Sequence, residues 1–248
     1  MKIACLIHGE PRLYREFDSI LTGLKGADSI DWYFYLWQDN NGNPAWAQDS
    51  SSKWRDHMVG SRWKTVDQAA AQEFIKHNLE PPNKLAGLLL GDKHTVEEFV
   101  NPSARPTIHL MYYSMQQVYK MINNEYDLVI KARGDVHLQQ PIELDTVLTR
   151  LNSASNVILM PNNGHYGEHR INDQFAIGKM PVMEIYCGLY EELHNLKSNG
   201  CQWHPETLLG THLKNNGIEC QPGEFGIDLR ATGTVVDGAY IPDFGRWN

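Results

Sequence analysis

Two charged side chains that follow an apolar run are the first residues of this sequence whose types suit chemistry. Residues 128–130 (Leu-Val-Ile) predict a strand buried on both faces, and Arg133 and Asp135 come directly after this strand. Ligands of open α/β sheets bind at the carboxyl ends of the strands. If the extended backbone persists, the two side chains project on the same side. A cation and a carboxylate there suit a ligand with phosphates and a divalent metal, and a surface ion pair is the alternative.

A second group of candidate residues follows the first apolar run of the chain. Residues 3–7 predict a strand, His8 and Gly9 begin a turn, and residues 13–24 have the apolar spacing of a helix. A strand, a glycine-containing turn and a helix form the opening unit of a nucleotide-binding α/β fold. The turn matches neither GxGxxG nor the P-loop pattern. Arg12, at the start of this helix, is placed to reach a phosphate or to pair with a neighbouring carboxylate.

The elements that position these residues alternate between strands and helices, which predicts an α/β fold. Apolar runs predict strands of one central sheet at residues 3–7, 32–36, 128–132 and 157–160, and a strand-like pattern covers residues 171–178. Helices are expected at residues 13–24, 66–79, 106–123, 142–151, 181–196 and 206–215. Residues 85–90 fit a strand or a buried turn, and residues 38–62 read as a long polar loop. We therefore expect a single domain, residues 1–248, with a Rossmann-like, mostly parallel sheet flanked by helices.

Composition excludes several classes of function. The net charge of −8 argues against a general nucleic-acid binder, which would carry a basic field. The apolar segment between Lys2 and Glu10 is too short for a signal sequence, and no stretch approaches the length of a membrane span. The four cysteines lack CxxC or zinc-like spacing, which favours reduced thiols in a cytoplasmic protein.

Several segments together resemble one enzyme family. The segments YDLVIKARGDVHL, NDQFAIG, HPETLLGTHLKNNGI and IHGEPRLYREF resemble GT-A-type glycosyltransferases of the small bacterial and viral kind, in order and spacing over most of the chain. The resemblance implies a GT-A-like fold and a nucleotide-sugar donor bound across the Rossmann-like half. It also implies a glycan, lipid or other hydroxyl acceptor near the C-terminal half. His8, Gly9, Arg12 and Arg133 are then the candidates for binding the donor.

The chain departs from the family at its metal motif. Where the family has DxD, this sequence has Arg133, Gly134 and Asp135. Asp135 can still bind a divalent ion on the donor's diphosphate, whereas the planar fork of Arg133 could hold a phosphate directly. Oxygen ligands suit Mg²⁺ or Mn²⁺, and a histidine would favour Mn²⁺. His204, with His165 as a second choice, could complete the metal or phosphate shell.

Glycosyl transfer also needs a carboxylate that deprotonates the acceptor hydroxyl when the reaction inverts the sugar. Asp173 is the first choice because it lies at a polar junction before an apolar strand, although a turn-forming aspartate would look the same. Glu206 is the second choice, and its alternative role is that of a residue favoured by the helix dipole.

Other functions fit the same sequence. A nucleotide-sugar or carbohydrate-binding module that has lost turnover is suggested by Arg133 in place of an acidic residue. A sugar nucleotidyltransferase is disfavoured because GEPR is a poor match to the glycine-rich, basic loop of that class. A metal hydrolase is disfavoured because the eleven histidines show no HxH or HExxH spacing.

Overall fold

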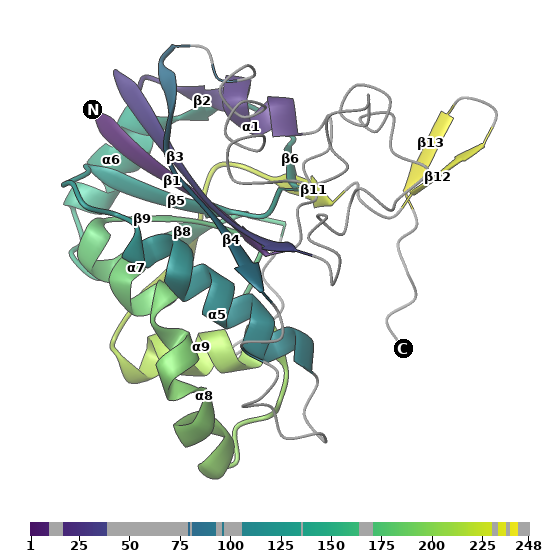
Figure 1. Cartoon of the computed structure of the whole chain (residues 1–248). Helices are drawn as coiled ribbons and strands as arrows, with labels where there is room; N and C mark the ends of the chain where they lie inside the picture. The colour runs from purple at the N-terminus through teal and green to yellow at the C-terminus, as the bar shows by residue number, and fades with distance from the viewer. Residues whose placement is uncertain are drawn as a thin grey trace.

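The computed structural model describes residues 1–9, 17–38, 79, 81–92, 96, 106–134, 136–163, 171–229, 233–236 and 239–242. In this part of the chain, seven strands form one central sheet in the order β10-β8-β9-β5-β1-β3-β4 (Figure 1). In chain order these strands are β1 (Lys2–Gly9), β3 (Ser29–Gln38), β4 (Asn83–Asp92), β5 (Leu128–Ala132), β8 (Val157–Met160), β9 (Phe175–Gly178) and β10 (Glu219–Pro222). The four strands predicted for the sheet are all present in it, so the α/β class is confirmed.

The sheet is mostly parallel. Strand β1 runs parallel to β3 and β5, β3 is parallel to β4, and β10 is parallel to β8. Strand β9 alone among the seven is antiparallel to both of its neighbours, β5 and β8. Every residue of β5 is buried, as its unbroken apolar run predicts for an interior strand covered on both faces.

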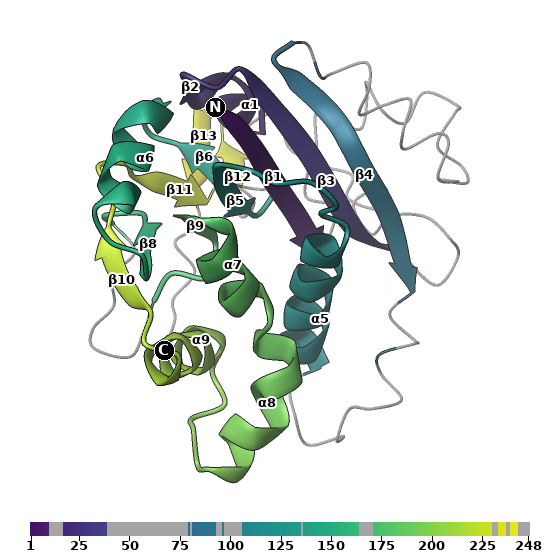
Figure 2. The ribbon, with the colours of Figure 1, turned by 90° about the vertical axis from the view of Figure 1, so that its left-hand side faces the viewer.

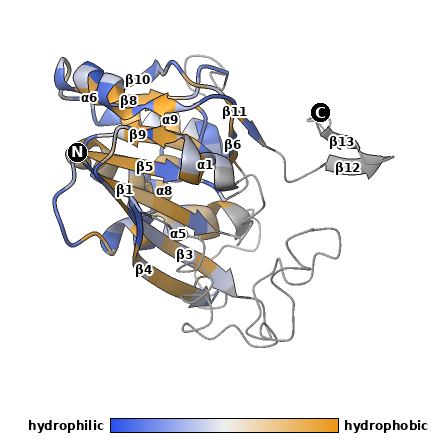
Figure 3. Ribbon diagram, turned by 90° about the horizontal axis from the view of Figure 1, so that it is seen from above, coloured by the Kyte–Doolittle hydropathy of each residue, from blue (hydrophilic) through white to orange (hydrophobic). Residues whose placement is uncertain are grey.

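Helices cover both faces of the sheet. One face carries α5 (Pro106–Lys120), α7 (Met180–Cys187), α8 (Leu189–Ser198) and α9 (Pro205–Asn215), which lie in front of the sheet in Figure 2. The other face packs against α1 (Phe17–Gly23) and α6 (Leu144–Asn152). Alternate residues of β1 enter the two cores, Cys5 on the side of α1 and α6 and Leu6 on the side of α5. Most of β1, β8 and β9 is accordingly coloured as hydrophobic in Figure 3.

Short strand pairs lie outside the central sheet. Strand β11 (Ile227–Leu229) pairs antiparallel with β6 (Val136–Leu138), and β12 (Gly233–Val236) pairs antiparallel with β13 (Ala239–Pro242). Strand β2 (Leu24–Lys25) runs parallel to β7 (Ile142–Glu143).

Three predicted helices have different bounds because tertiary pairing or a glycine interrupts them. The predictions of helix at Leu24 and at Ile142 were wrong, since these two residues pair with each other in β2 and β7. The single helix predicted for residues 181–196 is two helices. Gly188 separates them, and its N–H donates to the carbonyl oxygens of Glu184 and Ile185 at the end of α7.

Two strand predictions also change. The strand expected over residues 171–178 is confined to β9, and only Ile171 forms an isolated bridge before it. Residues 85–90, which fitted a strand or a buried turn, belong to the strand β4. A Cβ on Gly91 of this strand would lie 2.3 Å from the Tyr35 hydroxyl, so only glycine leaves room for that ring.

The helix predicted for residues 66–79 and the loop predicted for residues 38–62 lie almost entirely outside the described residues. Among the helices that the structure does describe, none has the length and apolar character needed to cross a membrane.

Candidate functional site

The carboxyl ends of β1 and β5 bring together residues that are far apart in the sequence. The two strands are parallel, and their register pairs Ile7 with Ala132. His8 and Arg133, each one residue further along, therefore lie at the same edge of the sheet. The predicted donor-binding residues His8, Gly9 and Arg133 share this carboxyl edge, whereas Arg12 lies outside the described residues.

Gly9 ends β1 in a conformation that favours glycine. Its φ is +97°, in the left-handed region, and a Cβ added there would have no atom of the described residues within 4 Å. Glycine therefore suits this last residue of β1, where it still pairs with Leu36 of β3.

The hydrogen bonds of His8 fix the tautomer of its ring. The Ser114 hydroxyl donates to the Met111 carbonyl oxygen at 2.9 Å, so its oxygen is left to accept the bond from His8 Nδ1 at 3.0 Å. Nδ1 then carries the ring proton and Nε2 has a free lone pair. Nε2 is buried, and no described residue forms a hydrogen bond with it. Burial, together with the positive charges of Lys131 and Arg133, lowers the pKa of His8 well below its ordinary value, so the ring is neutral.

Lys131 places a second cation beneath the carboxyl edge. Its side chain is 1% exposed, and Nζ donates a hydrogen bond to the carbonyl oxygen of Asp173. A buried ammonium group without such partners would be costly. This contact ties the segment before β9 to β5 and brings Asp173, 42 residues away, to the same edge.

The strand geometry expected after β5 does not continue. Arg133 follows the last strand residue, its N–H donates to the Gln174 carbonyl oxygen at 3.0 Å, and its own carbonyl oxygen accepts from the Val136 N–H at 3.3 Å. The chain thus turns at Arg133, so the extended backbone on which Arg133 and Asp135 would project on the same side does not persist. Asp135 itself lies outside the described residues.

Asp173, the first candidate for the catalytic base, is almost fully buried beside two tyrosines. The Asx-type contact expected of it is made instead by Asn172, whose Oδ1 accepts from the Gln174 N–H at 2.7 Å. Burial and then the Asp173 carboxylate raise the pKa of both Tyr112 and Tyr186 well above the ordinary value. The Tyr186 hydroxyl is buried and has no hydrogen-bond partner among the described residues.

Glu206, the second candidate, approaches the same tyrosine from the start of α9. The Tyr112 hydroxyl donates to the Pro205 carbonyl oxygen at 2.6 Å, and the Glu206 carboxylate contributes to the raised pKa of Tyr112. Two carboxylates predicted separately from the sequence therefore lie around one phenol. Asp173 is 9% exposed and lies on the segment that Lys131 holds, which connects it to the carboxyl edge.

His204 caps the start of α9 and faces Glu206 across 4.0 Å, measured from Nδ1 to Oε2. Among the described residues, no three His, Cys, Asp or Glu side chains are grouped to hold a metal ion. Asp135 and His165 are outside this part of the chain, so the metal role predicted for Asp135 and His204 stays a prediction. The described residues by themselves do not form a divalent metal centre.

The sequence reasoning missed Lys131, Tyr112 and Tyr186 as members of the site. Lys131 carried a readable signal, because a lysine directly after an apolar run of a buried strand must have a buried partner. Tyr112 and Tyr186 carried none, since tyrosines on the apolar face of a helix look the same when they only pack.

No family model matches the chain, and no curated protein matches it either.

Proposed function

We propose that this protein is a glycosyltransferase, which moves a sugar from a nucleotide-sugar donor to a hydroxyl group of a glycan, lipid or small acceptor. The observation that carries the proposal is the carboxyl edge itself. There Arg133, a neutral His8 and the Asp173 carboxylate meet on segments connected by the buried Lys131. The resemblance of the same segments to GT-A-type enzymes supports the proposal, and so does the mostly parallel α/β sheet.

In this proposal the cations handle the leaving group. The bond between the sugar's anomeric carbon and the diphosphate oxygen breaks, and its electron pair stays on the departing nucleoside diphosphate. The Arg133 guanidinium can make paired, charge-assisted hydrogen bonds to that anion and stabilise its developing charge. Lys131 is buried, so it contributes its field rather than a direct contact.

Asp173 serves as the base in the same step. The acceptor hydroxyl oxygen forms the new bond to the anomeric carbon, and its proton passes to the Asp173 carboxylate. The raised pKa values of Tyr112 and Tyr186 keep both phenols neutral at pH 7. They therefore add no second negative charge beside the carboxylate.

Isothermal titration with a panel of nucleotide sugars, with and without Mn²⁺, tests donor binding. Replacing Arg133 with Ala should weaken the best nucleotide sugar by about 1.5–3 kcal/mol, the scale for a hydrogen bond to a charged group. Arg133→Lys keeps the charge but loses the forked guanidinium. Its affinity for the nucleotide sugar should therefore lie between those of the wild type and Arg133→Ala.

Turnover with candidate acceptors then separates the two functions that the sequence allows. Donor binding with no transfer to any hydroxyl acceptor would favour the non-catalytic binding module. If no nucleotide sugar binds the folded wild-type protein, the glycosyltransferase and the nucleotide-sugar-binding module are both excluded, and only a carbohydrate-binding module is left.

A further inference from the structure

A groove on the helical face of the sheet is separate from the carboxyl edge and has the character of a ligand site. It lies between α5, α8 and the turn before α9, and has a volume of about 690 Å³. This volume is within the range of roughly 300–1,000 Å³ that is typical of small-molecule sites. Its walls include His109, Tyr190, Leu193, Lys197 and Trp203.

The aromatic walls of the groove are held by their neighbours. The rings of Trp203 and His109 lie 5.1 Å apart, and Lys197 Nζ lies 5.1 Å from the Trp203 ring. Tyr190 packs edge-on against Tyr113 of α5 with the ring centroids 5.1 Å apart. The groove therefore presents aromatic surface beside polar groups in fixed positions, which is the mixture that binds amphipathic ligands.

Two charged side chains line the groove, Glu191 and Lys197, and they differ in their partners. The Glu191 carboxylate accepts a hydrogen bond from Gln116 Nε2 at 2.8 Å and pairs with Lys120 at 3.5 Å. Lys197 has no ion pair among the described residues, so its charge is available to a ligand. Burial and the charge of Lys197 lower the pKa of His109, so this imidazole is neutral near pH 7 and can exchange hydrogen bonds with hydroxyl groups.

We propose that the groove binds an acidic saccharide, with Lys197 pairing with a carboxylate of the sugar. Sugar rings have apolar C–H faces that pack on aromatic walls, and hydroxyl groups that suit the scattered donors and acceptors. A nucleotide fits less well. Lys197 and Ser198 are at the C-terminal end of α8, where the helix dipole is negative and opposes a multiply charged phosphate.

The groove and the carboxyl edge are built on the same two segments. His109 and Tyr112 are three residues apart on α5 and so lie on one face of the helix, and Trp203 is two residues before Pro205. A saccharide chain in the groove can therefore extend towards Asp173 and serve as the acceptor. This acceptor role rests on the proposed glycosyl transfer, whereas the binding itself does not.

The test compares two oligosaccharides by titration on the full chain: hexagalacturonate, which is acidic, and maltohexaose, which is neutral. Lys197→Gln removes the positive charge of Lys197 from the groove, and Lys214→Gln makes the same change on an exposed part of α9. We expect hexagalacturonate to bind the wild type and Lys214→Gln equally, and to bind Lys197→Gln about tenfold more weakly. Maltohexaose should bind all three proteins alike and more weakly, and hexagalacturonate should shift the NMR signal of the Trp203 indole.

Other results would overturn this inference. They are no detectable hexagalacturonate binding at millimolar concentration, equal losses in both variants, or a Trp203 signal that moves with a nucleotide instead. Nucleotide-sugar titration of Lys197→Gln keeps the two proposals apart. If the nucleotide sugar binds normally and the saccharide does not bind, this inference is wrong and the proposed function stands. Saccharide binding at the groove, with no nucleotide sugar bound, ends the proposed function alone.

Discussion

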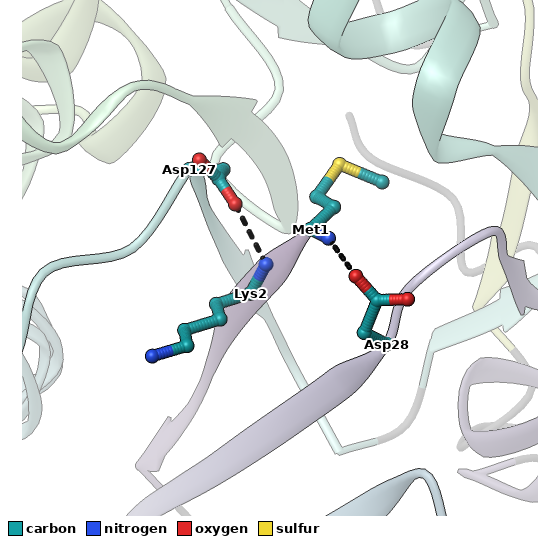
Figure 4. A network of polar contacts seen from close by, with 4 residues as sticks. All are labelled: Met1, Lys2, Asp28 and Asp127. Carbon is teal, nitrogen blue, oxygen red and sulfur yellow. Dashed lines mark hydrogen bonds and ion pairs between the residues drawn. The ribbon is translucent and has the colours of Figure 1, made fainter.

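The two ends of strands β5, β1 and β3 differ in how their polar groups are satisfied. At the amino edge, the Met1 ammonium pairs with Asp28, and the Lys2 N–H donates to Asp127 Oδ2 at 2.7 Å (Figure 4). The bonds are reciprocal, because the Asp127 N–H donates to the Lys2 carbonyl oxygen at 2.9 Å and the Asp28 N–H to that of Met1 at 3.0 Å. Among the described residues, these groups at the amino edge satisfy one another.

At the carboxyl edge of the same strands, some buried polar groups have no hydrogen-bond partner among the described residues. His8 Nε2 and the Tyr186 hydroxyl are buried and have no hydrogen-bond partner among the described residues, and the buried Lys131 cation lies near His8. Buried polar groups without partners are uncommon, and each calls for an explanation. Within the described residues, the polar groups of the amino edge are therefore paired with one another. Under the proposed function, the carboxyl edge gives up some stability to keep groups for the donor.

The largest expected effect would sharpen this contrast with one chemical change made at each edge. Asp173→Asn should lower kcat by about a hundredfold or more, because the base of the reaction is lost. Asp127→Asn, the same change at the amino edge, should leave kcat unchanged. Steady-state rates at saturating donor and acceptor measure both, with near-UV circular dichroism to check the fold.

Equal losses of kcat in the two variants would break the contrast. Glu206→Gln completes the experiment, and we expect a loss of less than about tenfold, since the proposed base is Asp173, on the segment that Lys131 holds. A collapse of kcat in Glu206→Gln with activity kept in Asp173→Asn would move the base to Glu206.

The next effect concerns acid stability at the carboxyl edge. Because the folded-state pKa of His8 is lowered, the unfolded chain takes up a proton below about pH 6.5 and the folded chain does not. The contribution to stability is therefore complete above about pH 6.5 and is lost as the pH falls, by up to about 1.4 kcal/mol per pH unit. His109 and His212, whose pKa values are also lowered, act in the same direction.

His8→Asn keeps a donor for Ser114 and removes the titration. Urea unfolding at several pH values should give a shallower loss of stability between pH 6.5 and pH 5 in this variant. A slope that matches the wild type would show that folding does not lower the pKa of His8, contrary to its burial beside the two cations.

The smallest expected effect is at the amino edge. Asp127→Ala removes the acceptor of the Lys2 N–H and should cost about 0.5–1.5 kcal/mol of unfolding free energy, the scale of one hydrogen bond. Nucleotide-sugar affinity should stay the same. A loss of ligand affinity in this variant would mean that the two edges are coupled through the strands.

The sequence determined the strands more reliably than the site. The apolar runs at residues 3–7, 128–132 and 157–160 became buried strands, because the pattern that predicts a strand is local and burial follows from it. Helix ends were less certain. Leu24 and Ile142 have the apolar character of helix residues, and only their partners, across more than a hundred residues, make them strand residues.

The composition of the site was decided by tertiary structure. From the sequence, His8 and Arg133 were candidates for donor binding and Asp173 for the base, with alternative roles open for Arg133 and Asp173. Strand order then brought the ends of β1 and β5 together, and the buried ammonium of Lys131 required a partner, which is the Asp173 carbonyl oxygen. Local pattern indicates which residues are buried, but which buried polar groups meet depends on the order and direction of the strands. That order, with β9 antiparallel between β5 and β8, is written in no single stretch of the sequence.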